Sequence, residues 1–289
     1  MSKWNDLCSH GIQLTFSSQA TLDVFCAVVG TTTPRNGPSS YIASKLTLII
    51  DSVHQTMESR VLAILDELEA TDVATLEAGV DLLDGFLYEL LPRIRQYHDT
   101  GTDGEIAKFK SLQDNFEFNI VARLLNYYRA VDGQWGEHTI RANQCLQGLL
   151  LTHTSSQKLF HRRANLQLII DMLDSSDKDV IISAITTIIH VLLKDLTNFR
   201  TFESLGGCSK IINHLDLDES MKIEQLNNHN RQQQNLNFKI IEFLIFYLID
   251  ESNMDGPTKS VAEKSSHFKK DFPEIDQLMK SLQELQVET

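Results

Sequence analysis

The feature that most constrains the fold is an internal repeat with a period of 42 residues. Phe160 of LLLTHTSSQKLF matches Phe202 of VLLKDLTNFRTF at that offset. Apolar residues in the two copies stay in the same register: Ile140 with Ile182, Ala142 with Ala184, Leu146 with Ile188, Leu149 with Val191, Ile169 with Ile211, Ile170 with Ile212 and Leu173 with Leu215. Helical repeats of about 40–47 residues are typical of armadillo and HEAT proteins, whose units bury their apolar faces by stacking. The repeat predicts an all-α, armadillo/HEAT-like α-solenoid superhelix.

One copy of the repeat could be mistaken for a strand. The segment VIISAITTIIHVLL, residues 180–193, is rich in β-branched residues, which favour strands. Its partner, residues 140–151, instead spaces its apolar residues at a helical period with Arg, Asn and Gln between them. We therefore expect residues 180–193 to form a helix that is buried on most sides.

The helical domain is expected to span residues 41–285, after a variable segment, 1–40, that contains a Gly/Pro/Ser/Thr loop. Pro92 is expected to kink or reset a helix, and Gly101–Gly104 to form a turn. A single helical pattern then runs from Glu105 to about Ala130. Its apolar stripe, expected in the core, consists of Leu112, Phe116, Ile120 and Leu124.

A third copy of the repeat helix is expected at residues 239–250, after a polar insertion at 226–237 (LNNHNRQQQNLN) that should form a flexible loop. Ser260 and Glu263 have the spacing of a capping box, which predicts a short helix from Val261. The last helical pattern begins at Glu274. Together these segments predict capping helices within 261–285, although the final helix could also dock in a groove.

The charge of the chain excludes some classes of partner. Its formal net charge is −13, which argues against binding nucleic acid or an anionic membrane surface. Ten of the acidic residues fall between Asp51 and Leu91, with Arg60 as the only base. This acidic stretch is either a solvated helix face or a patch that steers a basic partner. No apolar run is long enough to span a bilayer, so we expect a protein of the cytoplasm or the nucleus.

Motifs for catalysis, cofactors or metals are missing from the sequence. There is no phosphate-binding glycine loop, zinc-binding helix or nucleophile elbow. None of the four cysteines (Cys8, Cys26, Cys145, Cys208) has an Arg six residues later, as a cysteine phosphatase needs, and free buried thiols are expected. Cys145 paired with His153 or His161 is the remaining nucleophilic possibility. We expect no enzyme activity, no cofactor and no metal.

Two small groups of residues are candidates for partner binding. Asp114, Glu117 and Arg123 lie off the apolar stripe of their segment, so they are either solvated or part of a contact surface. Lys158, Arg162 and Arg163 form a small basic cluster, which is either a solvated helix surface or a phosphopeptide pocket. The glycine pair at 206–207 follows Leu205, where a left-handed helix cap and tight turn are expected.

Several segments together resemble a known family. These are residues 109–125 (FKSLQDNFEFNIVARLL), 146–173, 198–207 (NFRTFESLGG), 239–248 and 258–282. They are similar to the cell division control protein fourteen family of the fungal septation initiation network, which is unrelated to the phosphatase of the same name. The resemblance covers roughly residues 45–285, and segment 109–125 is its most specific part.

The resemblance implies a non-catalytic scaffold. Members of that family bind a germinal-centre-type (sterile-twenty-like) kinase, support its activity and location, and act at the spindle pole body before septum formation. The alternative is a general armadillo adaptor that holds extended peptides in a concave groove. That adaptor would need a ladder of surface Asn and Trp, and the only tryptophans, Trp4 and Trp135, do not recur at 42 residues.

Overall fold

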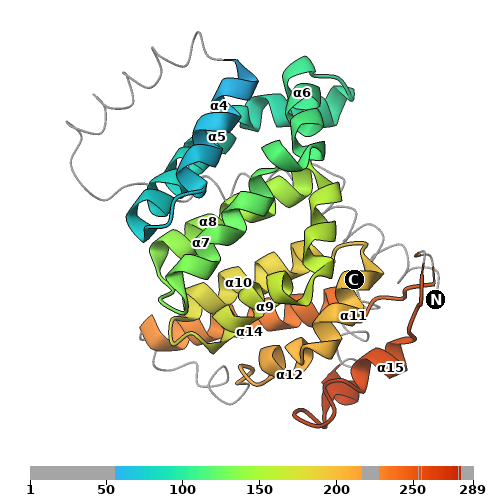
Figure 1. The fold of residues 1–289 in the computed structure, drawn as a ribbon. Helices are drawn as coiled ribbons and strands as arrows, with labels where there is room; N and C mark the ends of the chain where they lie inside the picture. The colour runs from blue at the N-terminus through green and yellow to red at the C-terminus, as the bar shows by residue number, and fades with distance from the viewer. Residues whose placement is uncertain (1–55, 217–227, 253, 255, 279, 281–289) are drawn as a thin grey trace. The chain divides into compact units, whose positions relative to one another are not determined.

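The computed structural model describes residues 56–216, 228–252, 254, 256–278 and 280. The regular elements of these residues are helical and include no strand, which confirms the all-α class (Figure 1). They are α4 (Met57–Leu68), α5 (Val73–Thr100), α6 (Gly104–Asp114), η1 (Phe116–Phe118), α7 (Ile120–Val131), α8 (Glu137–Thr152), η2 (Thr154–His161), α9 (Arg163–Asp171), η3 (Met172–Asp174), α10 (Lys178–Leu192), α11 (Leu196–Ser204), α12 (Gly207–Ile212), α14 (Asn228–Tyr247) and α15 (Val261–Ser265). The predicted variable segment, 1–40, lies outside the described residues.

These elements belong to two compact units. In the described part of the chain, the N-terminal unit comprises residues 56–130 and 144–156, and the C-terminal unit comprises 131–143 and 157–280. The boundary at residues 143–144 falls within α8.

A helical hairpin begins the N-terminal unit. α4 and α5 lie side by side (Figure 1), and α6 packs against both. Thr56 and Asp72 cap the two hairpin helices, because each side chain accepts a hydrogen bond from a backbone N–H of the first turn. α5 continues through Pro92 to Thr100, so this proline does not end or reset the helix. The helix ends instead at Gly101, whose φ of 72° suits a left-handed cap.

The single long helix expected between Glu105 and Ala130 is also wrong. α6 ends at Asp114 and α7 begins at Ile120, with the 3₁₀ turn η1 between them. The side chain of Asn115 accepts from the N–H of Glu117 at 3.0 Å, and Asn119 accepts from the N–H of Ala122 at 3.0 Å. Asparagine competes with the helix for backbone hydrogen bonds in this way, and the two asparagines break the pattern into two helices.

In the C-terminal unit, the segment with many β-branched residues is helix α10, as predicted. It packs beside α14 and also contacts α9 and η3 (Figure 1). The order of elements recurs with the sequence repeat: η2 and α9 follow α8, and α11 and α12 follow α10. Phe160 and Phe202 are both 0% exposed, which confirms that the repeat places an aromatic ring in the core at each position.

The polar insertion is not the loop that was expected, in the part of it that the structure describes. α14 begins at Asn228, and Gln233, Leu236 and Asn237 are buried. Gln233 Nε2 donates to the carbonyl of His214 at 3.1 Å and to Asn237 Oδ1 at 2.9 Å. The backbone N–H of Asp216 donates to Asn237 Oδ1 at 3.2 Å. These amide side chains satisfy the backbone at the end of the preceding segment, so a polar sequence can be buried.

The other local predictions agree with the structure. Gly206 takes the left-handed conformation between α11 and α12, as predicted. Ser260 and Glu263 form a capping box at the start of α15. Residues 275–278 are helical and Ile275 is buried; most of the final helix pattern lies outside the described residues.

Candidate protein-docking surface

A rigid corner between α6 and α7 forms the most distinctive surface of the N-terminal unit. Gln113, which is 2% exposed, holds the corner from inside. Its Nε2 donates to the carbonyl of Phe118 at 3.0 Å, and its Oε1 accepts from the N–H of Ile120 at 2.8 Å. Asn119 Nδ2 donates to the carbonyl of Gln113 at 2.7 Å and to Ser156 Oγ at 3.0 Å. The backbone of η1 is therefore fixed at both ends by buried amide groups.

Phe116 is displayed at the tip of this corner. It is 65% exposed, so its expected place in the core stripe is wrong. Two other members of the stripe, Ile120 and Leu124, are buried at 0% exposure, because they lie on α7 beyond the break. The break rotates Phe116 out of the register that a continuous helix would have given it.

Arg123 lies beside the ring of Phe116. Its guanidinium carbon is 5.5 Å from the ring centroid, and its Nε donates to the carboxylate of Glu69, which follows α4. The Arg123 side chain is only 20% exposed. Its orientation is thus set by an ion pair on one side and an aromatic face on the other, as in a cation–π contact.

The structure brings together three of the six sequence-predicted partner residues. Asp114 ends α6 with its side chain 69% exposed, Glu117 is exposed in η1, and Arg123 faces Phe116 from α7. We call these residues, with Phe116 and Glu69, the Phe116 surface. Lys158, Arg162 and Arg163 belong to the C-terminal unit, where all three are exposed.

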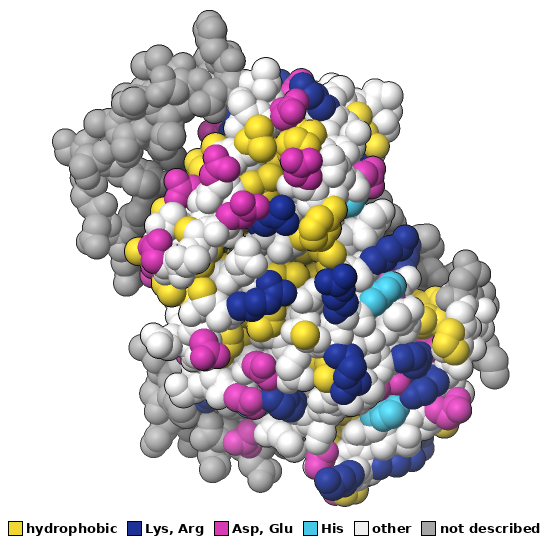
Figure 2. Space-filling view, in the orientation of Figure 1, with side chains coloured by type: hydrophobic (Ala, Val, Ile, Leu, Met, Phe, Trp, Pro, Cys, Tyr) yellow, Lys and Arg dark blue, Asp and Glu magenta, His cyan; other side chains and the backbone are white. Residues whose placement is uncertain are grey.

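The acidic stretch continues over the same unit. Magenta side chains are spread over α4 and α5 in Figure 2. Among the acidic residues of the stretch that the structure describes, the exposed ones are Glu58, Asp66, Glu69, Asp72, Asp81 and Glu89. Glu89 pairs with Arg60 at 2.5 Å, and Arg60 is the only base in the stretch. The electrostatic field near this unit is therefore negative.

A serine, a histidine and an aspartate meet beneath the corner. His153 Nδ1 is 2.8 Å from Ser156 Oγ, and its Nε2 is 2.9 Å from Asp114 Oδ1. The burial is the reverse of that in a hydrolase, because Ser156 is 2% exposed while the Asp114 side chain is 69% exposed. A nucleophilic serine must reach its substrate, and this one is enclosed and bonded to Asn119. The trio fixes the corner to the end of α8.

The cysteine–histidine possibility gains no support from the geometry of the N-terminal unit. Cys145 is buried, and both ring nitrogens of His153 are engaged by Ser156 and Asp114. In the C-terminal unit His161 Nε2 contacts Asp195 at 2.8 Å, and burial raises the pKa of Cys208 to about 12. A thiol with that pKa is protonated near neutral pH and is a poor nucleophile.

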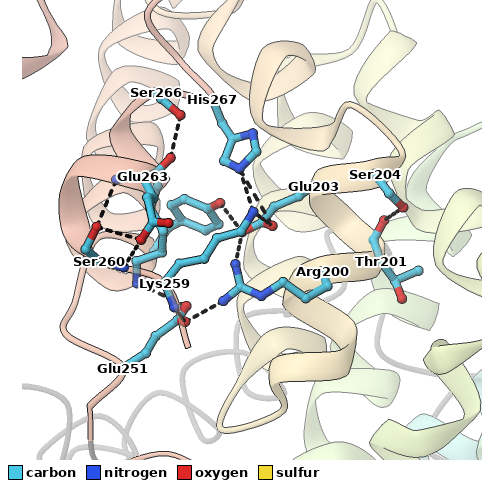
Figure 3. A network of polar contacts seen from close by, with 12 residues as sticks. Arg200, Thr201, Glu203, Ser204, Glu251, Lys259, Ser260, Glu263, Ser266 and His267 are labelled. Atoms are coloured by element: carbon cyan, nitrogen blue, oxygen red, sulfur yellow. Dashed lines mark hydrogen bonds and ion pairs between the residues drawn. The ribbon is translucent and has the colours of Figure 1, made fainter. Parts of the chain in front are cut away.

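A dense set of charged side chains joins α11 to the segment that follows α14 (Figure 3). Arg200 bonds to Glu203 at 2.6 Å and to Glu251, and Lys259 Nζ donates to Glu203 at 2.6 Å. Burial acts to raise the pKa of Glu203. Hydrogen bonds from Lys259 and Tyr247 and the charge of Arg200 outweigh this effect, so the net shift of the pKa is downward. The Glu203 carboxylate is therefore ionised, and its oxygens bond to Arg200, Lys259 and Tyr247 within the cluster.

At the centre of this cluster Lys264 is completely buried. Its Nζ donates to the carbonyl of Ile249 and lies 3.3 Å from Glu251 Oε1. It also lies 5.8 Å and 5.5 Å from the ring centroids of Phe199 and Tyr247. Each charge faces an opposite charge, so the cluster holds α15 in place instead of presenting a reactive group. We call it the Lys264 clasp.

No group of three His, Cys, Asp or Glu side chains that could hold a metal ion is found among the described residues. In the same part of the chain, no helix has the length and apolar character needed to cross a membrane. Sequence reasoning missed the exposure of Phe116 and the roles of Glu69 and Ser156. The polar residues at 113–115 and Asn119, which interrupt the apolar spacing, were the available signal.

Comparison with known proteins identifies the family. A model of the family described as "Cell division control protein 14, SIN component" matches residues 57–258. "Cell division control protein 14" of Schizosaccharomyces pombe is 26% identical over 145 residues, which is 49% of this chain and 55% of that protein. The alignment thus spans about half the length of this curated relative. No solved structure matches. Because the family model covers more than half of its length, the chain belongs to the cell division control protein 14 family of septation initiation network components.

Proposed function

We propose that this protein is a non-catalytic scaffold that binds a germinal-centre-type (sterile-twenty-like) kinase and supports its activity and its location at the spindle pole body during septation. Membership of the septation initiation network family supports a role in division signalling. The observation that carries the docking role is the exposed Phe116, held on a rigid corner beside an oriented arginine. Aromatic residues and arginine dominate the energetics of protein interfaces.

The scaffold is proposed to be an armadillo-like solenoid. The 42-residue repeat of sequence, helix order and buried phenylalanine supports this fold. The alternative, a general armadillo adaptor for extended peptides, needs a ladder of surface asparagines. Asn143, Asn165 and Asn198 of the C-terminal unit are instead buried, and each donates hydrogen bonds within that unit. The kinase scaffold is therefore favoured.

Two physical effects follow from this reading. A protein that binds the active conformation of a kinase better than the inactive one shifts the kinase toward activity by its differential affinity. A preference of about 1.4 kcal/mol changes the active-to-inactive ratio about tenfold. The carboxylates of α4 and α5 should speed association with a basic kinase surface, so the association rate should fall as ionic strength rises.

The test uses the full chain and the germinal-centre-type kinase from the same organism. Phe116→Ala should weaken binding at least about 30-fold, the loss expected of an interface hot spot worth about 2 kcal/mol. Phe238→Ala, which removes an equally exposed ring (70%) on α14, is the matched control and should change the affinity less than about threefold.

Kinase activity is followed in the same titration. We expect activation by the wild type and by Phe238→Ala, with loss of activation by Phe116→Ala at concentrations that saturate the wild type. Equal affinity of both variants would remove the Phe116 surface from the interface. No detectable binding of the wild type at micromolar concentrations would reject the partnership itself.

A further inference from the structure

The C-terminal unit carries a basic surface that the scaffold role does not explain. Three exposed cations, Lys158, Arg162 and Lys194, are found where η2 meets the turn between α10 and α11. Among the described residues, none accepts a hydrogen bond or ion pair from their side chains. We call these three residues the basic seam, and we propose that it binds a phosphorylated serine or threonine of a partner protein.

Two side chains, those of Gln157 and His161, hold the seam together. Gln157 Nε2 donates to the carbonyls of His190 and Leu193 at 2.8 and 3.1 Å, and His161 Nε2 lies 2.8 Å from Asp195 Oδ2. Lys158 directly follows the anchor residue Gln157, and Arg162 directly follows the anchor residue His161, which ends η2. Lys194 lies between Leu193 and Asp195, the two residues that Gln157 and His161 contact in the turn between α10 and α11. The three cations are therefore positioned from both sides of one junction.

The neighbouring charged groups are already engaged. Asp195, the acid at this junction, contacts His161 and accepts from the N–H of Asn198 at 3.0 Å. Arg163 donates to Ser204, at the end of α11. In Figure 2 Lys, Arg and His side chains gather over α9 and α11. Asp195 contributes one negative charge at this junction, and the three cations of the seam outnumber it.

The sequence around the seam differs from the rest of the chain. The chain has 39 acidic residues and a net charge of −13, yet none of residues 138–170 is acidic. Electrostatic interactions are screened within about 8 Å at physiological ionic strength, so an anion at the seam responds to the local cations more than to the distant carboxylates. A local basic surface on an acidic protein selects for a concentrated negative charge.

A phosphate group suits this geometry better than a carboxylate. It carries a charge of about −1.5 to −2 and three acceptor oxygens, enough to engage several cations at once. The guanidinium of Arg162 can form a bidentate pair with it, while the two lysines act as point charges. Lys194 has a φ of 56°, an uncommon conformation for a residue with a Cβ, so the turn holds its backbone there at a conformational cost.

The probe for the test is a degenerate peptide library with one fixed phosphoserine or phosphothreonine, compared with the same library left unphosphorylated. Binding to the full chain is measured by fluorescence anisotropy. We expect the phosphorylated library to bind at least about tenfold more tightly. The variant Lys158→Ala/Arg162→Ala/Lys194→Ala should lose this preference. Arg162→Lys, which keeps the charge but not the fork, should lose part of it.

The matched control removes three exposed cations elsewhere in Lys108→Ala/Arg231→Ala/Lys270→Ala, with the same change in net charge. It should keep the preference, and thermal melts should show both triple variants folded. Equal binding of the two libraries to the wild type, or an unchanged preference in the seam variant, would overturn the proposal. The proposal would also be overturned if the wild type showed no preference for phosphopeptides but bound phosphatidylserine vesicles, and the seam variant lost that vesicle binding. Phe116→Ala should leave the preference intact, so the seam and the kinase interface can fail separately.

Discussion

Lys264 offers the sharpest test of how the C-terminal unit is held together. Its side chain is 0% exposed, as is that of Glu251, which lies 3.3 Å away. Burial lowers the pKa of Lys264, and the charge of Glu251 opposes that effect. A buried cation is tolerated only where a nearby anion and acceptor offset the loss of hydration. Here the offset comes from Glu251, the Ile249 carbonyl and two aromatic rings.

The perturbation is Lys264→Met, which keeps most of the volume of the side chain and removes its charge. Removing one partner of a buried ion pair costs about 3–5 kcal/mol, because the other charge is left buried. Glu251 keeps Arg200 and the N–H of Lys259, the latter at 2.8 Å, so we expect the lower end of that range, about 3 kcal/mol. Lys270→Met, at an exposed position near α15, should stay within about 0.5 kcal/mol of the wild type.

Urea denaturation measures the free energy of unfolding, and amide hydrogen exchange of α15 shows whether this segment opens before the rest. The double variant Lys264→Met/Glu251→Gln removes both charges and should recover part of the loss, because replacing both partners is less costly than leaving one. A Lys264→Met protein as stable as the Lys270→Met control, with α15 equally protected, would refute the reasoning. So would a double variant whose loss is the simple sum of the two single ones.

Gly207 and His190 allow two further tests in the C-terminal unit. A Cβ added at Gly207 would lie 2.1 Å from the ring of Phe202, so Gly207→Ala should destabilise by about 1–3 kcal/mol in a thermal melt. Gly85→Ala, where nothing lies within 4 Å in a helix interior, should be neutral or stabilising by up to about 1 kcal/mol, and a similar loss in both variants would contradict the packing argument. Burial lowers the pKa of His190, so the unfolded state binds more protons and stability falls as the pH drops below about 6.5. His190→Gln should reduce that slope by up to about 1.4 kcal/mol per pH unit in denaturation at pH 5–7, and an unchanged slope would exclude His190 as a contributor.

The repeat made the core of the C-terminal unit predictable. Two copies with one register reveal which positions face inward, and Phe160 and Phe202 are both buried as this logic requires. The same comparison settled that residues 180–193 are helical despite their β-branched side chains. Local cap chemistry was equally readable, because the Ser260–Glu263 spacing specifies reciprocal hydrogen bonds between near neighbours.

The predictions that were wrong concern polar side chains that form hydrogen bonds with backbone groups five or more residues away. Gln113 and Asn119 stabilise a break in an otherwise helical pattern, and this moved Phe116 from the expected core to the surface. Asn237 is buried because it bonds to Asp216, 21 residues earlier. Periodicity treats such amides as solvated or neutral positions. Their partners become visible only when the chain is folded.

Both proposed surfaces, the Phe116 surface and the basic seam, depend on a buried amide side chain that bonds to the backbone. η1, which presents Phe116, is fixed by the buried side chain of Gln113, and η2, which carries Lys158, is fixed by the buried side chain of Gln157. A buried amide that loses its partners costs about 1–3 kcal/mol, so each 3₁₀ segment resists rearrangement. Side chains on a fixed backbone lose less conformational entropy when a partner binds. The helices supply the core, and the amide-locked turns between them present the groups available for recognition.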